Sequence, residues 1–398
     1  NHLSKKERKL LDYYKKKVIP ASTIGKSYKG IEVAQSLVAW AERFDKEMKA
    51  KFPGEKLGLA HYKTLGSSDE KNVARSQAYF YYMFGWSRTP NTSWEDIFKV
   101  RLKLVENARE RYELARGVEM GQRNCVGDDL SDVRDRFYGN NRLRAKESAH
   151  GTHVAGIIGA TRENGIGMDG VADVELMVLR VSAGKGDEYD KDVANAIRYA
   201  VENGARIINM SFGKFFSPQR KWISDAMKLA EKKGVLLVHA AGNNSVSIDE
   251  ETVYPTKHLT KRSVLSNFIT VGSTDMEGIP VISSNYGREN VDVFAPGFDI
   301  YSTILDGNYK KMGGTSMAAP VVSGVAALVW NYFPELSVKQ LKQVLLESVT
   351  PRGKVLKPQS RMLAIPRSSV EFSELCVSGG IINALKAVQL AEKTIGRK

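Results

Sequence analysis

Three adjacent stretches decide the fold: "ARIINMSFG" (Ala205–Gly213), "RKWISDAMKLAEKKG" (Arg220–Gly234) and "VLLVHAAG" (Val235–Gly242). The first and third are short runs rich in apolar and β-branched residues, which predicts buried strands. The middle stretch repeats apolar residues at helical spacing and ends on a glycine, which predicts a helix. A strand, a helix and a strand in this order predict two parallel strands joined by a crossover helix.

The same alternation continues on both sides of this unit. Short apolar runs that predict further strands cover residues 174–181, 268–274 and 291–297, and a helical pattern covers 191–204. Together these segments predict an α/β fold with a mainly parallel central sheet flanked by helices on both faces. Ligands of such sheets bind at the carboxyl ends of the strands. We therefore expect a site where small residues follow two of the strands, at residues 211–214 and 240–245.

The bulk composition is that of an ordinary globular protein, with 42% hydrophobic and 26% charged residues in a chain of 398. No apolar run reaches the roughly 18 residues that predict a transmembrane segment. The opening "NHLSKKERKLLDYY" is charged and amphipathic, unlike a signal peptide. Because the sequence does not begin with an initiator methionine, we expect the chain to be a mature product or a fragment.

Residues 1–124 form a basic half in which we find no chemical motif. They hold 25 Lys and Arg against 15 Asp and Glu, a net charge of +10. Helical patterns cover residues 4–18, 32–52 and 93–117, and the aromatic cluster "YFYYMFGW" (Tyr79–Trp86) is interpreted as hydrophobic packing rather than a ligand-stacking surface. The charge could bind polyanions or form a solvated face. Since no zinc finger or helix-turn-helix pattern is present, we expect no specific nucleic-acid partner.

The stretch "SAHGTHVAGIIGA" (Ser148–Ala160) places His150 and His153 three residues apart, on one face of a predicted helix. The pair could be two ligands of one metal ion, a catalytic base with a packed neighbour, or two histidines without a role. A zinc site needs further ligands, and neither HExxH nor a cysteine or carboxylate at liganding spacing is nearby. His239 lies in a predicted strand and is expected to be buried. No role is assigned to His2, His61 and His258.

A third notable stretch is "KMGGTSMAAPVVSGVAALVWNYF" (Lys311–Phe333), in which Ser316 precedes an apolar helix. A serine there can simply cap the helix, and Gly313 and Gly314 can simply form a turn. Small neighbours also let a second backbone approach, and the N–H of Ser316 at a helix N-terminus could stabilise an oxyanion. The string is not G-x-S-x-G, so the nucleophile elbow of α/β-hydrolases is not matched.

Taken together and in this order, "AHGTHVAG", "INMSFG", "AAGN" and "GGTSMAAPVVSG" resemble the subtilisin-like serine proteases, or subtilases. The similarity covers roughly Gly139 to Gly396. It implies a subtilisin-like three-layer fold, with residues 125–398 as the catalytic core and residues 1–124 as a mainly helical insertion. It also implies a serine endopeptidase that cuts protein or peptide substrates through an acyl-enzyme.

The resemblance assigns a role to each motif. Ser316 matches the nucleophile and His150 the general base. Asn243 matches the side-chain donor to the oxyanion, working with the N–H of Ser316. His153 is then a packed neighbour of the base, one turn along the helix. A second group of residues matches the substrate cleft: Ser211, Phe212 and Gly213 the edge that pairs with an extended substrate, and Ala241 and Gly242 the opposite wall of a broad pocket for apolar or aromatic side chains.

One member of the catalytic triad has no counterpart in this chain. Subtilases carry an aspartate in a V-x-V-x-D-[ST]-G string upstream of the histidine, and this string is absent. The acidic stretch "VGDDLSDVRDRFYGNN" (Val126–Asn141) reads as a polar loop. None of the upstream aspartates follows an apolar strand or precedes Ser/Thr-Gly: Asp12, Asp45, Asp69, Asp96, Asp128, Asp129, Asp132 and Asp135.

Two explanations compete for the missing aspartate. Secreted bacterial subtilases with a long charged insertion between the aspartate and the histidine resemble this chain. The aspartate strand would then lie before Asn1, in a longer enzyme or in a separate N-terminal fragment that stays bound. Alternatively, the chain is an inactive subtilase-fold protein that binds peptides or regulates a partner. The complete histidine, asparagine and serine motifs favour the first explanation.

The remaining expectations concern ions, cysteines and location. "RENGIGMDGVA" (Arg162–Ala172) resembles a family loop in which Asn164 would bind structural calcium; a plain turn is the alternative, and catalysis requires no cofactor. Cys125 and Cys376 could form one bridge, but two arbitrary cysteines rarely meet. From the habit of the family, we expect a secreted or cell-envelope protein.

Overall fold

The computed structural model describes residues 49–55, 126–145, 148–182, 187–215, 217–260, 262–359 and 368–396. The chain divides into two compact units, one of residues 1–123 with 361–366 and one of residues 124–360 with 367–398. The helices predicted in residues 1–124 lie outside the described residues, apart from Lys49–Lys51, which is helical. The aromatic cluster 79–86 and Cys125 also lie outside them.

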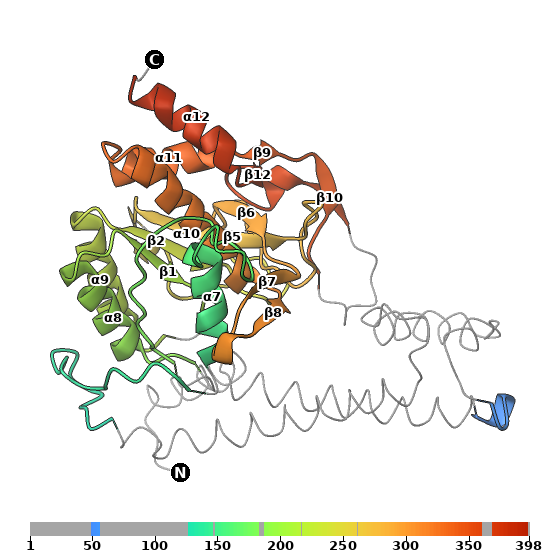
Figure 1. Cartoon of the computed structure of the whole chain (residues 1–398), viewed down its shortest axis with the longest axis horizontal. Coiled ribbons are helices and arrows are strands. Elements are labelled where there is room, and N and C mark those ends of the chain that lie inside the picture. The colour runs from blue at the N-terminus through green and yellow to red at the C-terminus, as the bar shows by residue number, and fades with distance from the viewer. Residues whose placement is uncertain are drawn as a thin grey trace, which may run out of the picture. The chain divides into compact units, whose positions relative to one another are not determined.

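The second unit is built on a six-stranded sheet with the order β1-β2-β5-β6-β12-β9 (Figure 1). Its strands are β1 (Ile207–Met210), β2 (Leu236–Ala240), β5 (Phe268–Thr274), β6 (Val293–Pro296), β12 (Gly380–Ile381) and β9 (Thr350–Pro351). All neighbouring strands are parallel except β12 and β9. The predicted parallel sheet is confirmed, and the quoted stretches around residues 205–213 and 235–242 form the neighbouring strands β1 and β2.

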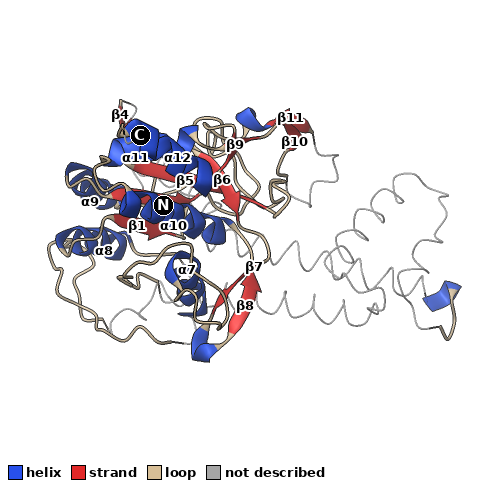
Figure 2. Cartoon of the chain, turned by 45° about the horizontal axis from the view of Figure 1, so that its top comes forward, coloured by secondary structure: helices blue, strands red, loops and turns tan. Residues whose placement is uncertain are grey.

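Helices cover both faces of the sheet, which makes three layers (Figures 1 and 2). One face carries α8 (Asp190–Glu202) and α9 (Arg220–Lys232), and the other carries α10 (Thr315–Tyr332), α11 (Val338–Glu347) and α12 (Ala384–Thr394). The strands divide their side chains between the faces with the period of two expected for a strand. In β2, Leu236 and Val238 join the core under α10, whereas Leu237 joins the core under α8 and α9.

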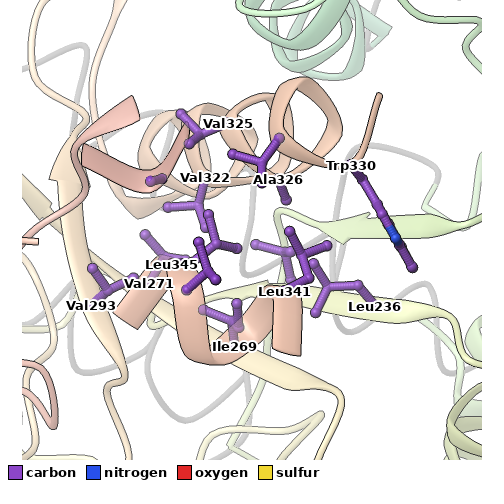
Figure 3. Packing of buried hydrophobic residues seen from close by; sticks show 14 of the residues in the cluster. Leu236, Ile269, Val271, Val293, Val322, Val325, Ala326, Trp330, Leu341 and Leu345 are labelled. Atoms are coloured by element: carbon purple, nitrogen blue, oxygen red, sulfur yellow. The ribbon is translucent and has the colours of Figure 1, made fainter. Parts of the chain in front are cut away.

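The core between the sheet and α10 consists of buried apolar side chains (Figure 3). Ile269 and Val271 of β5 meet Val322 and Ala326 of α10, and all four side chains are fully buried. Burying each large aliphatic side chain contributes roughly 1.5–3 kcal/mol relative to exposure. This packing fixes the position of α10, and with it the position of Ser316 in its first turn.

Outside the sheet, short hairpins and one further helix complete the unit. α7 (Ala149–Gly159) contacts α10 and β7. The hairpin of β7 (Ile300–Thr303) and β8 (Tyr309–Met312) is antiparallel and leads directly into α10. The other two pairs are also antiparallel: β3 (His258–Thr260) with β4 (Ser263–Val264), and β10 (Lys354–Leu356) with β11 (Ser369–Glu371).

One predicted strand is wrong. Residues 174–181 form no strand, and Leu176, Met177 and Val178 are 42%, 43% and 47% exposed. An apolar run forms a strand only when its backbone pairs with a neighbour, and the described sheet ends at β1. Among the described residues, no helix is both long enough and apolar enough to span a membrane.

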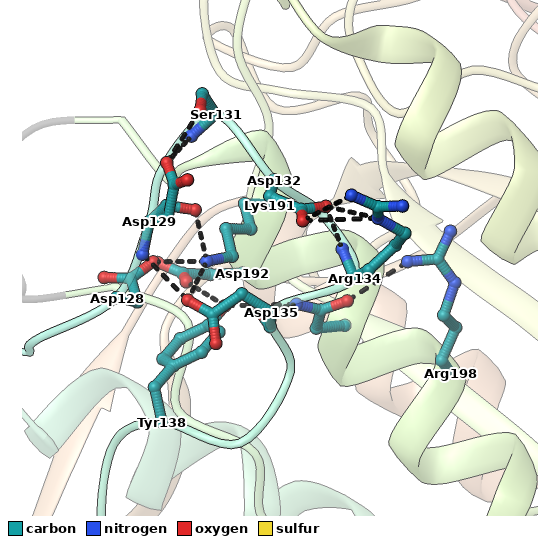
Figure 4. A network of polar contacts seen from close by, with 11 residues as sticks. Asp128, Asp129, Ser131, Asp132, Arg134, Asp135, Tyr138, Lys191, Asp192 and Arg198 are labelled. Carbon is teal, nitrogen blue, oxygen red and sulfur yellow. Dashed lines mark hydrogen bonds and ion pairs between the residues drawn. The ribbon is translucent and has the colours of Figure 1, made fainter.

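The acidic loop 126–141, expected to be a polar loop, has no helix or strand but is anchored by a buried lysine (Figure 4). The Lys191 ammonium of α8 lies 2.7 Å from Asp128 Oδ2 and 3.1 Å from Asp135 Oδ2, and it donates to the Asp129 carbonyl at 2.6 Å. It also lies 4.5 Å from the centre of the Tyr138 ring. Both Lys191 and the Asp128 side chain are almost completely buried. The loop is therefore fastened to the outer helix layer.

Replacing Lys191 with alanine is expected to lower the free energy of unfolding by about 3–5 kcal/mol, because it leaves Asp128 as a buried carboxylate without its cation. Urea denaturation followed by circular dichroism measures this. The matched control is Lys221→Ala, which breaks an exposed pair with Asp225 on the next helix and should cost under about 1 kcal/mol. Equal losses for the two variants would contradict this account of the loop.

Candidate active site

α7 presents its two histidines to different surroundings. His153 is fully buried, and its Nε2 donates to the carbonyl oxygens of Ile300 at 3.0 Å and Lys310 at 2.9 Å. His150, one turn earlier, is exposed to solvent at the start of the helix. The prediction that His153 is a packed neighbour is confirmed, and so is the burial of His239 in β2. The described residues hold no cluster of His, Cys, Asp or Glu that could bind a metal ion.

Ser316 lies in the first turn of α10 and is half-buried. Its Oγ donates to the Ser211 carbonyl at 3.1 Å, and the Ser211 hydroxyl donates to the Ser316 carbonyl at 2.9 Å. The Ser211 hydroxyl also accepts from Nδ2 of Asn209 at 2.8 Å, and the Asn209 Oδ1 accepts from the Ser323 hydroxyl at 3.0 Å. This chain of polar contacts fixes the end of β1 against the start of α10.

Asn243 follows β2 and faces the same helix terminus. Its Oδ1 accepts the backbone N–H of Thr315 at 2.9 Å and the Thr315 hydroxyl at 3.2 Å. The Thr315 hydroxyl in turn accepts the N–H of Gly242 at 3.1 Å. Because the oxygen of the Asn243 amide is held in this way, the orientation of its Nδ2 is fixed as well. An amide donor fixed beside the N–H groups of a helix N-terminus suits a developing negative charge.

Gly314 makes this close approach possible. Its φ is +141°, and a Cβ at this position would lie 3.1–3.4 Å from the amide atoms of Asn243. Any other residue would be strained in its backbone and would push Asn243 away from Thr315. Of the two uses that the sequence left open for Gly314, a turn and a close approach of a second backbone, the structure shows the close approach.

The two walls predicted for the substrate cleft lie at neighbouring strand ends. Ser211, Phe212 and Gly213 follow β1, after which Lys214 pairs with Tyr254 through two backbone hydrogen bonds of 3.0 and 2.8 Å. Phe212 is half-buried and packs against the core under α8 and α9, and Gly213 is exposed.

The buried side chain of Asn285 stabilises the second predicted wall, which consists of Ala241 and Gly242. Its Nδ2 donates to the Ala241 carbonyl at 2.8 Å, and its Oδ1 accepts the N–H of Asn244 at 2.9 Å. These bonds hold Ala241 and Gly242 in place just before Asn243.

Within the part of the chain that the structure describes, no hydrogen bond or ion pair joins a carboxylate to His150. Asp128 and Asp135 contact Lys191, Asp132 pairs with Arg134, and Asp129 accepts from Ser131. Asp12, Asp45, Asp69 and Asp96 lie outside the described residues.

The loop around Asn164 satisfies its own polar groups. Asn164 Oδ1 accepts the N–H of Ile166 at 2.9 Å, and Asp169 Oδ1 accepts the N–H of Glu163 at 3.0 Å. The Arg162 guanidinium donates to the Gly170 carbonyl and places a positive charge in the loop. Asn164, Asp169 and Arg162 thus all take part in hydrogen bonds within the loop. Cys376 is a free, buried cysteine.

Sequence reasoning missed Thr315, Asn209, Ser323 and Asn285. Thr315 and Asn209 stand inside the quoted motifs "GGTS" and "INMSFG", and a polar side chain at the end of an apolar strand is a usable signal. Asn285 lies in a loop 42 residues beyond Asn243. No pattern in the sequence connects it to the Ala241 wall.

For the peptide hydrolysis that the resemblance implies, replacing Thr315 with valine is expected to lower kcat about fivefold and to leave KM unchanged. Valine keeps the shape of threonine but removes one donor to Asn243 Oδ1, and a hydrogen bond is worth about 1 kcal/mol. Steady-state kinetics measures this, with Thr315→Ser as the control that keeps the hydroxyl. A valine variant with the kcat of the parent would show that the Thr315 hydroxyl does not position the amide.

For the peptide hydrolysis that the resemblance implies, and in the chain without an added carboxylate, the acid limb of kcat/KM is expected to lie below the ordinary histidine pKa of about 6.5. Desolvation by the surrounding protein lowers the pKa of His150, although its side chain still reaches solvent at the start of α7. The imidazole therefore stays neutral, and able to accept a proton, to a lower pH than an ordinary histidine. A limb at or above pH 6.5 would contradict this.

The pH profile needs a stability control, because burial also lowers the pKa of His239, to about 4. In the unfolded chain this histidine takes up a proton near its ordinary value, whereas in the folded chain it does not. Acid therefore favours unfolding as the pH falls from about 6.5 towards 4. Circular dichroism at each pH separates this loss from the titration of His150.

Residues 121–362 match a family model described as the subtilase family. Subtilisin DY of Bacillus licheniformis is 35% identical over 220 residues, which cover 54% of this chain and 76% of that protein. The thermophilic serine proteinase of Bacillus sp. (strain AK1) is 40% identical over 181 residues, 45% of this chain and 42% of that protein. The cell wall-associated protease of Bacillus subtilis (strain 168) is 34% identical over 232 residues, 58% of this chain and 24% of that protein.

Among solved structures, the prenylagaramide maturation protease PagA is similar, with a TM-score of 0.50 and 30% identity. The match covers 62% of this chain and 84% of that structure. Together with the parallel sheet between two helix layers, these similarities confirm the subtilisin-like fold. The chain spans less than half the length of two of the curated relatives named above.

Proposed function

Because this chain belongs to the subtilase family, we propose that it is a serine endopeptidase that cleaves peptide bonds of proteins or peptides through an acyl-enzyme. The observation that carries the proposal is the placement of Ser316. The Ser316 hydroxyl donates to the Ser211 carbonyl, directly after β1. At the N-terminus of the same helix, the Thr315 N–H donates to Asn243 Oδ1 and holds that amide in place. A nucleophile and an oxyanion donor thus occur together at the carboxyl end of the sheet.

In the proposed reaction, Ser316 Oγ leaves its hydrogen bond to the Ser211 carbonyl and attacks the carbonyl carbon of the substrate. His150 accepts the hydroxyl proton and later returns it to the leaving amine. The Asn243 Nδ2 and the Ser316 N–H stabilise the oxyanion. The substrate pairs in extended form with Ser211–Gly213, and the side chain before the cut faces the wall of Ala241 and Gly242. These steps use protein groups only, and we propose that a calcium ion at loop 162–172, if bound, would be structural.

We further propose that a segment outside this chain supplies the carboxylate that orients His150, on a strand added beside β1. Two observations support the added strand. β1 is the last strand of the described sheet, and three of its four residues are only half-buried although two of them are isoleucine. Apolar Leu176, Met177 and Val178 are exposed as well. A parallel strand beside β1 would end near Ser211, at the edge of the sheet that carries the site.

A second candidate function follows from the absence of a carboxylate bonded to His150 among the described residues. The protein would then be an inactive subtilase-fold module that binds peptides or regulates a partner. A fluorophosphonate probe distinguishes the two functions, because it reacts with an activated serine and not with a capping serine. Labelling that disappears in Ser316→Ala supports the protease. Failure to label the protein together with its carboxylate-bearing segment would exclude the protease.

We also propose that the protein acts outside the cytoplasm, as a secreted or envelope enzyme. The cell wall-associated protease among its relatives supports this location. Cell fractionation with an antibody against residues 126–398 tests it.

A further inference from the structure

The side chain of His153 joins the helix that carries His150 to the hairpin that leads to Ser316. His153 lies on α7, and its two acceptors, the carbonyls of Ile300 and Lys310, belong to β7 and β8. β8 ends at Met312, and α10 begins at Thr315, so the hairpin is continuous with the first turn that holds Ser316. The buried ring of His153 thus hydrogen-bonds to both strands of the hairpin and lies one helical turn from the expected base. Figure 2 shows α7 beside this hairpin.

Two further hydrogen bonds run in the opposite direction across the same contact. The Ser302 hydroxyl of β7 donates to the His153 carbonyl at 2.9 Å, and the Thr303 hydroxyl donates to the Thr152 carbonyl at 3.0 Å. The approach is so close that a Cβ on Gly156 would lie 2.3 Å from Thr303 Oγ1 and 2.5 Å from Ser302 Oγ. The hairpin is therefore clamped to α7 at a fixed distance.

The hydrogen bonds also fix the tautomer of His153. Carbonyl oxygens only accept, so Nε2 must carry the proton, and Nδ1 is then an acceptor. Nδ1 is buried, and no residue in the described part of the chain donates to it. Protonating it would place a charge and an unpaired N–H inside the protein, which is costly. His153 thus stays a neutral Nε2–H donor and adds no positive charge beside His150.

We propose that His153 is a positioning residue for the reaction, which sets the separation between the His150 imidazole and the Ser316 hydroxyl by clamping α7 to the β7–β8 hairpin. It touches neither substrate nor the reacting atoms. A shift of about 1 Å between a base and its nucleophile can cost about a hundredfold in rate, so a clamp between their two elements has a direct kinetic consequence. This inference rests on the proposed function of Ser316 and His150.

The test compares two variants that change one property each. His153→Phe keeps an aromatic ring in the buried space but removes the N–H, whereas His153→Gln keeps an amide N–H the same number of bonds from Cα. We expect kcat to fall about ten- to hundredfold in the phenylalanine variant, with KM within about twofold of the parent, and to recover most of this loss in the glutamine variant. Both values are taken per fluorophosphonate-titrated site, well below the unfolding temperature.

A stability control separates positioning from simple destabilisation. Met227→Ala removes a buried side chain of α9, on the face of the sheet opposite α10, and should lower the melting temperature without changing kcat per titrated site. A phenylalanine variant with the kcat of the parent, or a glutamine variant no better than phenylalanine, would overturn the inference. If the parent itself fails to label at Ser316, the proposed function fails instead, so the two failures are distinguishable.

Discussion

Replacing Ser316 with alanine is expected to lower kcat for peptide hydrolysis by about a millionfold in the enzyme supplied with its carboxylate; the magnitude is the one measured for this substitution in subtilisin, a relative of this chain. The loss is large because no other group can form the acyl-enzyme. KM should change little, since Ser211–Gly213 and the Ala241 wall still bind the substrate. Active-site titration and steady-state kinetics with a fluorogenic peptide measure both parameters.

The matched control is Ser348→Ala. Ser348 is a buried serine, and its hydroxyl makes no hydrogen bond with any described residue. Its removal should leave kcat unchanged. If Ser316→Ala kept more than about one-thousandth of the parent kcat, hydrolysis would not depend on Ser316 as a nucleophile.

Adding the carboxylate is expected to raise kcat by about ten-thousandfold over this chain alone, which is the loss seen when a triad aspartate is replaced. The experiment supplies an apolar segment ending in D-[ST]-G, fused before Asn1 or added as a separate polypeptide. The control is the same segment with asparagine for the aspartate. It should bind beside β1 in the same way but leave His150 unoriented.

Hydrogen exchange gives a second readout of this prediction. Amides of β1 and of residues 174–181 should exchange more slowly with either segment bound, because a strand is added at the edge. If both segments protect β1 but neither raises kcat, the peptide-binding function would replace the protease. If neither protects β1, the carboxylate comes from another place.

How much the sequence could predict depended on how local each feature is. Strands β2 and β5 were predictable because each is a single apolar run bounded by turn residues, and every residue of both is buried. Residues 174–181 are a similarly apolar run, yet they form no strand. Pairing requires a neighbour, and composition does not report whether that neighbour is present.

The residues of the candidate site also differ in how far the sequence could predict them. The resemblance could assign roles to His150 and Ser316 because each lies in a long, unusual local string, and to Asn243 through the short string "AAGN". Thr315 stands next to Ser316 in such a string, yet its contact with Asn243 spans 72 residues. Lys191 reads as an ordinary first-turn lysine of α8, and its burial depends on aspartates 56 and 63 residues away. Contacts between residues so far apart in the sequence depend on the tertiary fold and leave no local pattern.

The measurement that tests the central claim most directly is mass spectrometry of the acyl-enzyme. The protein, supplied with its carboxylate-bearing segment, is mixed with an activated ester and quenched in acid during the first turnover, and its peptides are then sequenced. Our account predicts one acyl group per molecule, on Ser316, and none when His150 is replaced with alanine. An acyl group on another residue, or none in the parent, would contradict it.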